Sequence, residues 1–346
     1  MQEATMASTT DDMSDDMSDA ATARAVGTPR PSTPTDNAPT NAAGSVADLI
    51  AAGGERLARV GVDTPRHDAK LLLAEATRAS LSDVDKAALL GDGVTKLVAG
   101  KSIGVDAALA DYSAMLARRE RREPLQYIVG HVPFRYLDIK VGPGVFIPRQ
   151  ETELLVDEAI GWVTRNGLYC PRVVDLCAGS GAIGLAIATE VPGAQVWGVE
   201  KDVLAAQWTR RNVQETGAVF PDITANYHLE IADATCPTTL AQLDGTVDVV
   251  VSNPPYIPLT DVPEQFEVRE YDPQTALYGG SADGMMVPER IIVRAAALLR
   301  PDGVLIMEHD VTQTDRTVAF ARASGFADAR TEIDLTGRPR YLVATR

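Results

Sequence analysis

Four consecutive residues, Asn253-Pro254-Pro255-Tyr256, carry the groups needed to hold a planar –NH₂ group. The prolines fix the backbone and lack N–H donors, so this segment presents carbonyl acceptors. Asn253 adds a side-chain carbonyl and Tyr256 an aromatic face, so acceptors can take both hydrogens while the ring packs on the plane. An amide or exocyclic amine nitrogen is a poor nucleophile, and holding it in line with an electrophilic methyl group lowers the entropic part of the barrier. The tetrapeptide by itself fits either this chemistry or a rigid turn after a strand.

A second group of residues, Asp175 to Gly181, joins a buried apolar run to a helical pattern. Gly179, Gly181 and Gly184 fit the pattern G-x-G-x-x-G, and Glu200 follows Gly179 by 21 residues. Such glycines let the backbone pass close to a ligand, the helix N-terminus offers free N–H groups, and the acid suits ribose hydroxyls. The loop by itself fits NAD, FAD or S-adenosylmethionine, and also a tight turn without a ligand.

The carboxylate of Asp175 distinguishes between these ligands. It would repel the pyrophosphate of a dinucleotide, but it would attract the ammonium and sulfonium groups of S-adenosylmethionine. Asp233 ends a third apolar run and could receive the adenine amino group, or could equally be a simple turn residue. The two motifs together predict transfer of a methyl group from S-adenosylmethionine to a nitrogen. Asn253, Pro254 and Tyr256 are the expected catalytic residues, and all four residues of the tetrapeptide are expected to bind the substrate.

Strand-like and helical patterns alternate from residue 172 to the end of the chain. The predicted strands are 172–176, 195–199, 227–231, 247–251, 304–307 and 341–344, and the predicted helices lie near 182–190, 203–216, 288–299 and 313–323. This alternation predicts a parallel, doubly wound α/β sheet, whose ligands lie at the carboxyl ends of the strands. Both motifs follow predicted strands, and we expect those two strands to be neighbours.

A helical segment is expected before the sheet, over residues 45–125. Ser45 can cap a first helix that Gly53-Gly54 weakens in its middle, Pro65 suits the first turn of a second, and a third spans 107–120. Alternation over 137–141, followed by two glycines and an apolar triplet at 145–147, predicts a β-hairpin linker over 126–147. Pro148, with acids following it, predicts a helix start that opens a domain over 148–346.

Composition narrows the class of protein. Lys and Arg number 32 against 48 Asp and Glu, a net charge of −16, and aromatic residues make up 5%, which disfavours a nucleic-acid partner. Residues 1–44 are poor in large apolar residues and predict a disordered acidic tail without a function. No apolar run approaches the roughly 18 residues of a membrane span and no signal peptide is present, so we expect a cytoplasmic protein without a membrane partner. The cysteines and histidines show no metal-ligand spacing, so no metal is expected.

Beyond these arguments, the sequence resembles the HemK/PrmC family, the release-factor glutamine methyltransferases, over about residues 45–346. The resemblance rests on five segments in the family's order: EPLQYIVG at 123–130, FIPRQETE at 146–153, the 175–181 loop, SNPPYI at 252–257, and ALYGG at 276–280 with Asp283-Gly284. Three features depart from the family. Cys177-Ala178 replace Gly-Thr, Gln150 replaces Pro, and the tail over 1–44 is extra.

The resemblance implies methylation of the glutamine side-chain nitrogen, N5, in the Gly-Gly-Gln motif of bacterial class I peptide chain release factors. It implies a seven-stranded, Rossmann-like methyltransferase domain and a helical domain that docks the factor, and we expect a monomer. The cofactor contacts then expected are Asp175, Cys177, Ala178, Gly179, Ser180, Gly181, Glu200, Asp233, Ala234 and Asn253. Two alternatives are a nucleic-acid amino-methyltransferase using the same tetrapeptide and a non-catalytic module that senses the cofactor.

Overall fold

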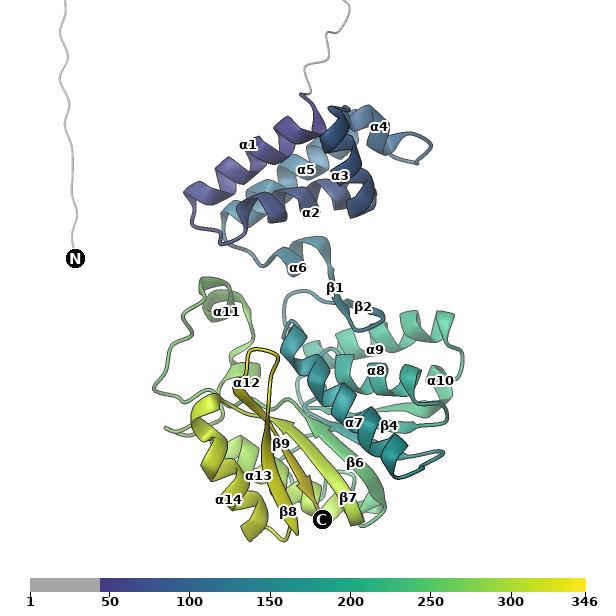
Figure 1. Ribbon diagram of the computed structural model, residues 1–346, viewed down its shortest axis with the longest axis vertical. Coiled ribbons are helices and arrows are strands. Elements are labelled where there is room, and N and C mark those ends of the chain that lie inside the picture. The colour runs from purple at the N-terminus through teal and green to yellow at the C-terminus, as the bar shows by residue number, and fades with distance from the viewer. Residues whose placement is uncertain (1–43) are drawn as a thin grey trace, which may run out of the picture. The chain divides into compact units, whose positions relative to one another are not determined.

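The computed structural model describes residues 44–346, so the tail predicted over 1–44 lies outside the described residues except for Gly44. The first described segment is helical, as predicted (Figure 1). Its helices are α1 (Val46–Arg59), α2 (Pro65–Thr77), α3 (Leu81–Leu90), α4 (Val94–Val98), α5 (Val105–Glu120) and α6 (Leu125–Val129). The patterns did not predict α3, α4 or α6. The latter two have five residues each, so packing rather than their own sequence must hold them.

Helix α1 begins where the sequence predicts, because Ser45 and Asp48 form a reciprocal capping box. Gly53, which by sequence is expected to weaken this helix, is explained by tertiary packing. A Cβ at this position would collide with the Tyr112 hydroxyl, so the glycine lets α5 approach α1 closely. Leucines from α1, α2 and α5 fill the core between the helices.

The hairpin exists, but its predicted strands were partly wrong. Strand β1 (His131–Phe134) pairs antiparallel with β2 (Leu137–Lys140). The segment 145–147 is not a strand, although its residues are buried. Pro133 lies in the first strand, which the sequence does not signal as β. The predicted helix start at Pro148 is also displaced, because a single 3-10 turn over Gln150–Thr152 precedes α7.

A seven-stranded sheet in the order β5-β4-β3-β6-β7-β9-β8 follows, which confirms the doubly wound fold. Its strands are β3 (Arg172–Leu176), β4 (Gln195–Glu200), β5 (Tyr227–Ile231), β6 (Val247–Ser252), β7 (Leu299–Glu308), β8 (Asp328–Ile333) and β9 (Pro339–Thr345). The predicted parallel pairing holds from β3 to β7, whereas β9 pairs antiparallel with both β7 and β8. The patterns missed β8, an edge strand in which only Ala329 is buried. A short turn joins β8 to β9, and such a connection requires antiparallel pairing.

Helices cover both faces of this sheet, and each face has its own apolar core (Figure 1). Val173 and Val174 show the division, since the first packs with α7 and α8 and the second with α13. The helices are α7 (Glu153–Arg165), α8 (Ala182–Glu190), α9 (Val203–Val219), α10 (Ile223–Asn226), α11 (Phe266–Tyr271), α12 (Gln274–Leu277), α13 (Met286–Leu298) and α14 (Thr314–Ala323). Between residues 44 and 346 we find no helix with the length and hydropathy to span a membrane.

The strand order reverses between β3 and β6. The chain runs from β3 outward through β4 and β5, and then returns to place β6 on the other side of β3. Diverging loops at such a switch point leave a crevice at the carboxyl ends of the strands. The glycine loop follows β3 and the Asn253 tetrapeptide follows β6, so the fold brings the two predicted motifs to that crevice.

Candidate active site

A cavity of about 260 Å³ lies at the carboxyl ends of β3, β4 and β6 and is lined by both motifs. Most of the predicted site residues line it: Cys177, Ala178, Gly179, Ser180, Glu200, Asp233, Ala234, Asn253, Pro254, Pro255 and Tyr256. Asp175 and Gly181 do not. The wall is completed by residues that the motifs did not single out as site residues, among them Phe146, Arg149, Thr152, Gln265 and Val268.

The loop after β3 is fixed to the next strand by two backbone groups. The amide of Ala178 donates to the Val199 carbonyl at 2.9 Å, and the amide of Gly179 donates to Glu200 Oε2 at 2.9 Å. A Cβ built at Gly179 meets no atom within 4 Å, so open space lies over this part of the loop. At Gly181 a Cβ would press on Thr209 at 2.8 Å, so that glycine serves packing against α9.

Cys177 adopts φ of 68°, a left-handed conformation that a residue with a Cβ rarely takes. This explains why the resembled family usually has glycine there. The substitution keeps the shape of the loop at a conformational cost of about 1 kcal/mol. Burial raises the pKa of the Cys177 thiol, and the nearby Glu200 and Asp175 carboxylates add to this effect, so the thiol stays protonated.

Asp175 does not contact the cavity, which corrects the idea that its charge meets a ligand directly. The side chain is fully buried, and its Oδ2 accepts the Gly184 amide of α8 at 3.0 Å. Its Oδ1 has no hydrogen-bond partner among the described residues. Burial raises the pKa of Asp175 to about 7, which the Gly184 hydrogen bond only partly counteracts. Asp175 therefore supports the first turn of α8 beneath the loop.

Glu200 and Asp233 keep free acceptor capacity toward the cavity. Glu200 accepts one backbone amide on each oxygen, from Gly179 and Asp202, so each oxygen retains a lone pair. Asp233 uses Oδ1 for the amide and hydroxyl of Thr235. Burial opposes ionisation of Asp233, but the Thr235 hydrogen bonds outweigh it and lower its pKa. Both side chains can thus receive hydroxyl or amino hydrogens of a ligand.

The tetrapeptide after β6 is held by side chains from distant segments. Asn253 Nδ2 donates to Thr152 Oγ1 at 3.3 Å, and the Tyr256 hydroxyl donates to Glu308 Oε1 at 2.9 Å. At the end of β6, the Ser252 hydroxyl donates to the Leu176 carbonyl of β3 at 2.6 Å. Asn253 Oδ1 has no hydrogen-bond partner in the part of the chain that the structure describes, so it remains available as an acceptor.

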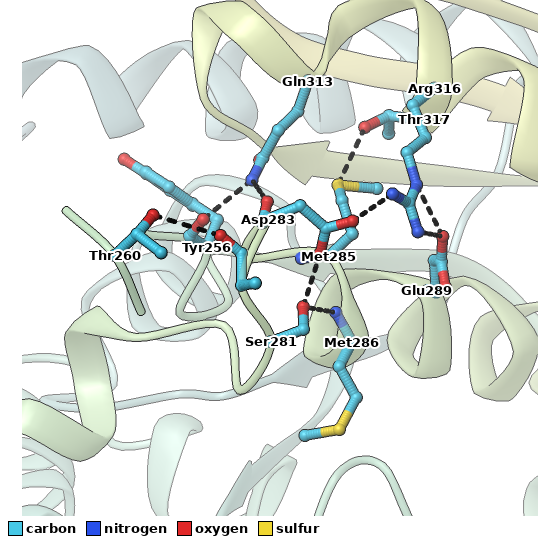
Figure 2. Close-up of polar contacts among 11 residues, drawn as sticks. Tyr256, Thr260, Ser281, Asp283, Met285, Met286, Glu289, Gln313, Arg316 and Thr317 are labelled. Carbon is cyan, nitrogen blue, oxygen red and sulfur yellow. Dashed lines mark hydrogen bonds and ion pairs between the residues drawn. The ribbon is translucent and has the colours of Figure 1, made fainter. Parts of the chain in front are cut away.

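A second contact fixes the backbone of the tetrapeptide from outside the cavity (Figure 2). Gln313 Nε2 donates to the Tyr256 carbonyl at 2.8 Å and to the Asp283 carbonyl at 3.1 Å. Gly284 follows at φ of 73°, and a Cβ there would collide with the same Tyr256 carbonyl. The Asp283-Gly284 turn therefore packs directly under the end of the tetrapeptide, and only glycine fits.

Sequence reasoning missed Glu308 and Gln313, and it named Thr152 only as part of a helix start. A signal for Glu308 was present. An acid that ends an apolar strand next to β6 must lie at the same edge as Asn253. Gln313 carries no such signal, because its contacts depend on how the loop after β7 folds back. No cluster of side chains suited to a metal ion occurs within residues 44–346.

Comparisons with known proteins show the family of the chain. The family model described as the PrmC N-terminal domain matches residues 48–130, and the one described as the methyltransferase small domain matches 153–265. The chain is 61% identical to a release factor glutamine methyltransferase of Bifidobacterium longum, over 86% of this chain and 99% of the relative. It is 40% identical to one of Streptomyces coelicolor, over 86% and 96%. A 4-amino-L-phenylalanine/4-methylamino-L-phenylalanine methyltransferase of Streptomyces pristinaespiralis is 35% identical, over 83% and 90%.

Proposed function

The chain belongs to the release factor glutamine methyltransferases, and we propose that its cavity holds the glutamine of a Gly-Gly-Gln motif for N5-methylation. The observation that carries this proposal is the shared cavity: the Asn253 tetrapeptide, suited to a primary amide, and a nucleoside-binding loop line one space. The test is incubation with a purified class I release factor and labelled S-adenosylmethionine, followed by peptide mass analysis. Label on the glutamine of Gly-Gly-Gln is expected, and label elsewhere or none would overturn the proposal.

The residues around the cavity fit the cofactor, S-adenosylmethionine, which would supply an electrophilic methyl group when bound and would keep the electron pair of the broken S–CH₃ bond as a neutral thioether. Glu200 has lone pairs for the two ribose hydroxyls, and Asp233 has one oxygen for the adenine amino group. The open space over Gly179 leaves room for the ligand beside the loop. Asp175, which does not line the cavity, would act by holding the loop and α8 in place.

The tetrapeptide would bind and orient the substrate amide. Asn253 Oδ1 and the Pro254 carbonyl accept the two amide hydrogens, and the Tyr256 ring packs on the amide plane. These acceptors stabilise the positive charge that grows on the nitrogen as it gains the methyl carbon. The alkylated nitrogen is acidic and loses a proton to solvent, so the chain needs no strong base.

Glu200→Ala should raise the dissociation constant for S-adenosylmethionine at least about 10-fold, because hydrogen bonds to a charged acceptor are lost. Isothermal titration calorimetry measures this directly. Glu230→Ala, an exposed acid near the end of neighbouring β5, is the matched control and should bind normally. An unchanged affinity for the Glu200 variant would place the ribose elsewhere.

We further propose that the helical domain, about 45–125, docks the release factor. The pocket recognises only a primary amide, so selection among many glutamines requires contacts remote from the nitrogen. Two arginines near the end of α5, Arg119 and Arg122, pair with Glu267 of α11 at 2.8 and 2.7 Å. Gln265 and Val268, which lie beside Glu267 in the chain, line the cavity. The ion pairs to Glu267 therefore connect the helical domain to the wall of the cavity.

This docking role predicts that a folded release factor is methylated far better than a short peptide with the same Gly-Gly-Gln. Steady-state kinetics on both substrates should show a kcat/KM at least about 100-fold higher for the factor, since remote binding energy is spent on positioning. Removing residues 1–44 should leave this ratio unchanged. Equal kcat/KM on the two substrates would refute the docking role.

The remaining partner assignments are proposals as well. The acidic composition supports a protein that does not contact nucleic acid directly, in contrast to amino-methyltransferases that act on DNA or rRNA. We propose a monomer that works in the cytoplasm, where bacterial release factors act. Label transferred to RNA or DNA, when either one replaces the release factor in the incubation, would favour the alternative.

A further inference from the structure

We propose that Glu308 is a positioning residue that acts through Thr152 to set which way Asn253 presents its side-chain amide. The inference rests on the proposed function, because it concerns how that same site holds its substrate.

Glu308 lies at the end of β7, next to the tetrapeptide. In the register of β6 and β7, Ser252 faces Met307, so Glu308 is level with Asn253. The Glu308 side chain is buried, with the residue 3% exposed, and its two oxygens have different partners. Oε2 accepts the Thr152 hydroxyl at 2.8 Å, and Oε1 accepts the Tyr256 hydroxyl at 2.9 Å. The Glu308 carboxylate therefore binds Tyr256, the last residue of the tetrapeptide, and also Thr152, which contacts Asn253.

The direction of these hydrogen bonds is determined by the chemistry of the groups. An ionised carboxylate only accepts, so the single hydroxyl hydrogen of Thr152 points to Glu308. The Thr152 oxygen is then left as an acceptor toward Asn253, which must offer its –NH₂ group, and Nδ2 lies 3.3 Å from that oxygen. Burial raises the pKa of Glu308 above its ordinary value, and the two donated hydroxyls and the charge of Arg340 offset only part of this rise.

This chain of donors leaves Asn253 Oδ1 facing away from Thr152 as a free acceptor. The two ends of an asparagine amide have nearly the same shape, so packing cannot choose between them and hydrogen bonds must. In the opposite orientation Asn253 would present –NH₂ to the substrate –NH₂, and two donors form no hydrogen bond. Glu308 thus makes the productive orientation the favoured one, and its bond to Tyr256 holds the ring.

Glu308→Gln is the informative substitution, because glutamine has almost the same size but adds a donor. It can give a hydrogen to Thr152, which frees the Thr152 hydrogen for Asn253 Oδ1 and favours the unproductive orientation. We expect kcat to fall about 100-fold, the loss typical of one positioned hydrogen bond. The KM for the release factor and the dissociation constant for S-adenosylmethionine should stay within about threefold, since Glu308 does not line the cavity.

Thr152 gives a second test that does not depend on the Glu308 variant folding. Thr152→Val removes the hydroxyl at nearly constant shape and should lower kcat about as much, whereas Thr152→Ser restores the hydroxyl and should recover most of it. Glu308→Gln should also cost much less when added to Asn253→Ala than when added to the wild type, because its effect passes through Asn253.

Three results would overturn the inference. They are a Glu308→Gln kcat within threefold of the wild type, equal kcat for Thr152→Val and Thr152→Ser, and additive effects of Glu308→Gln and Asn253→Ala. A lower melting temperature with unchanged kcat would show a structural role only. These outcomes differ from failure of the proposed function, in which the wild-type protein itself leaves the factor unlabelled and the inference falls with it.

Discussion

Asn253→Ala should abolish most methyl transfer, with turnover reduced about 10²- to 10³-fold, the loss typical of one positioned hydrogen-bonding group in a transition state. Asn253 Oδ1 is the only side-chain carbonyl of the tetrapeptide, and the structure leaves it free toward the cavity. Without it the substrate amide loses one of two acceptors, so its nitrogen is no longer held in line. Single-turnover kinetics with a release factor, at saturating S-adenosylmethionine, measures the effect on chemistry.

Binding of S-adenosylmethionine should fall much less in this variant, because Glu200, Asp233 and the loop over 177–180 remain in place. Asn226→Ala is the matched control. Asn226 lies in α10, contacts the Gln195 side chain and does not line the cavity, so its loss should leave turnover normal. Near-normal turnover of Asn253→Ala would disprove the role of Asn253 in orienting the amide.

Gly284→Ala should lower turnover about 100-fold, because it displaces the backbone of the tetrapeptide and a shift of roughly 1 Å costs about that much. A Cβ at this position collides with the Tyr256 carbonyl and comes within 2.9 Å of both Pro258 N and Gln313 Nε2. Two of these three contacts are backbone atoms, which cannot swing aside as a side chain would. Release-factor methylation and thermal unfolding together report the displacement.

Gly337→Ala separates this collision from the cost of the backbone conformation. Gly337 has φ of 81° against 73° for Gly284, but a Cβ on it meets no atom within 4 Å. The control should therefore lose about 1 kcal/mol of stability from the left-handed conformation and keep normal turnover. If the two variants lose equal activity, the Asp283-Gly284 turn does not position the tetrapeptide.

Local patterns in the sequence determined the chemistry-bearing motifs and most of the elements that carry them. Strands β3 and β5 have the predicted bounds, and the first helix begins at its predicted cap, because these features depend on neighbouring residues. The placement of the two motifs at one edge of the sheet also followed from sequence, since strand–helix alternation predicts a doubly wound sheet and both motifs directly follow strands. The edge strand β8 and the hairpin strand β1 were missed, because their residues lack a continuous apolar pattern.

The tertiary structure alone decided which polar groups meet. By sequence Asp175 was a cofactor contact, yet the fold buries it under α8, because side-chain direction at a strand end depends on what packs beside it. Thr152 lies 101 residues from Asn253 and 156 from Glu308, and no periodicity links positions so far apart. The sequence thus determined that the Asn253 tetrapeptide and the glycine loop after β3 lie at one edge of the sheet, where they line one cavity. The orientation of Asn253 depends on the buried Glu308 carboxylate and the Thr152 hydroxyl, which only the folded chain brings within hydrogen-bond distance.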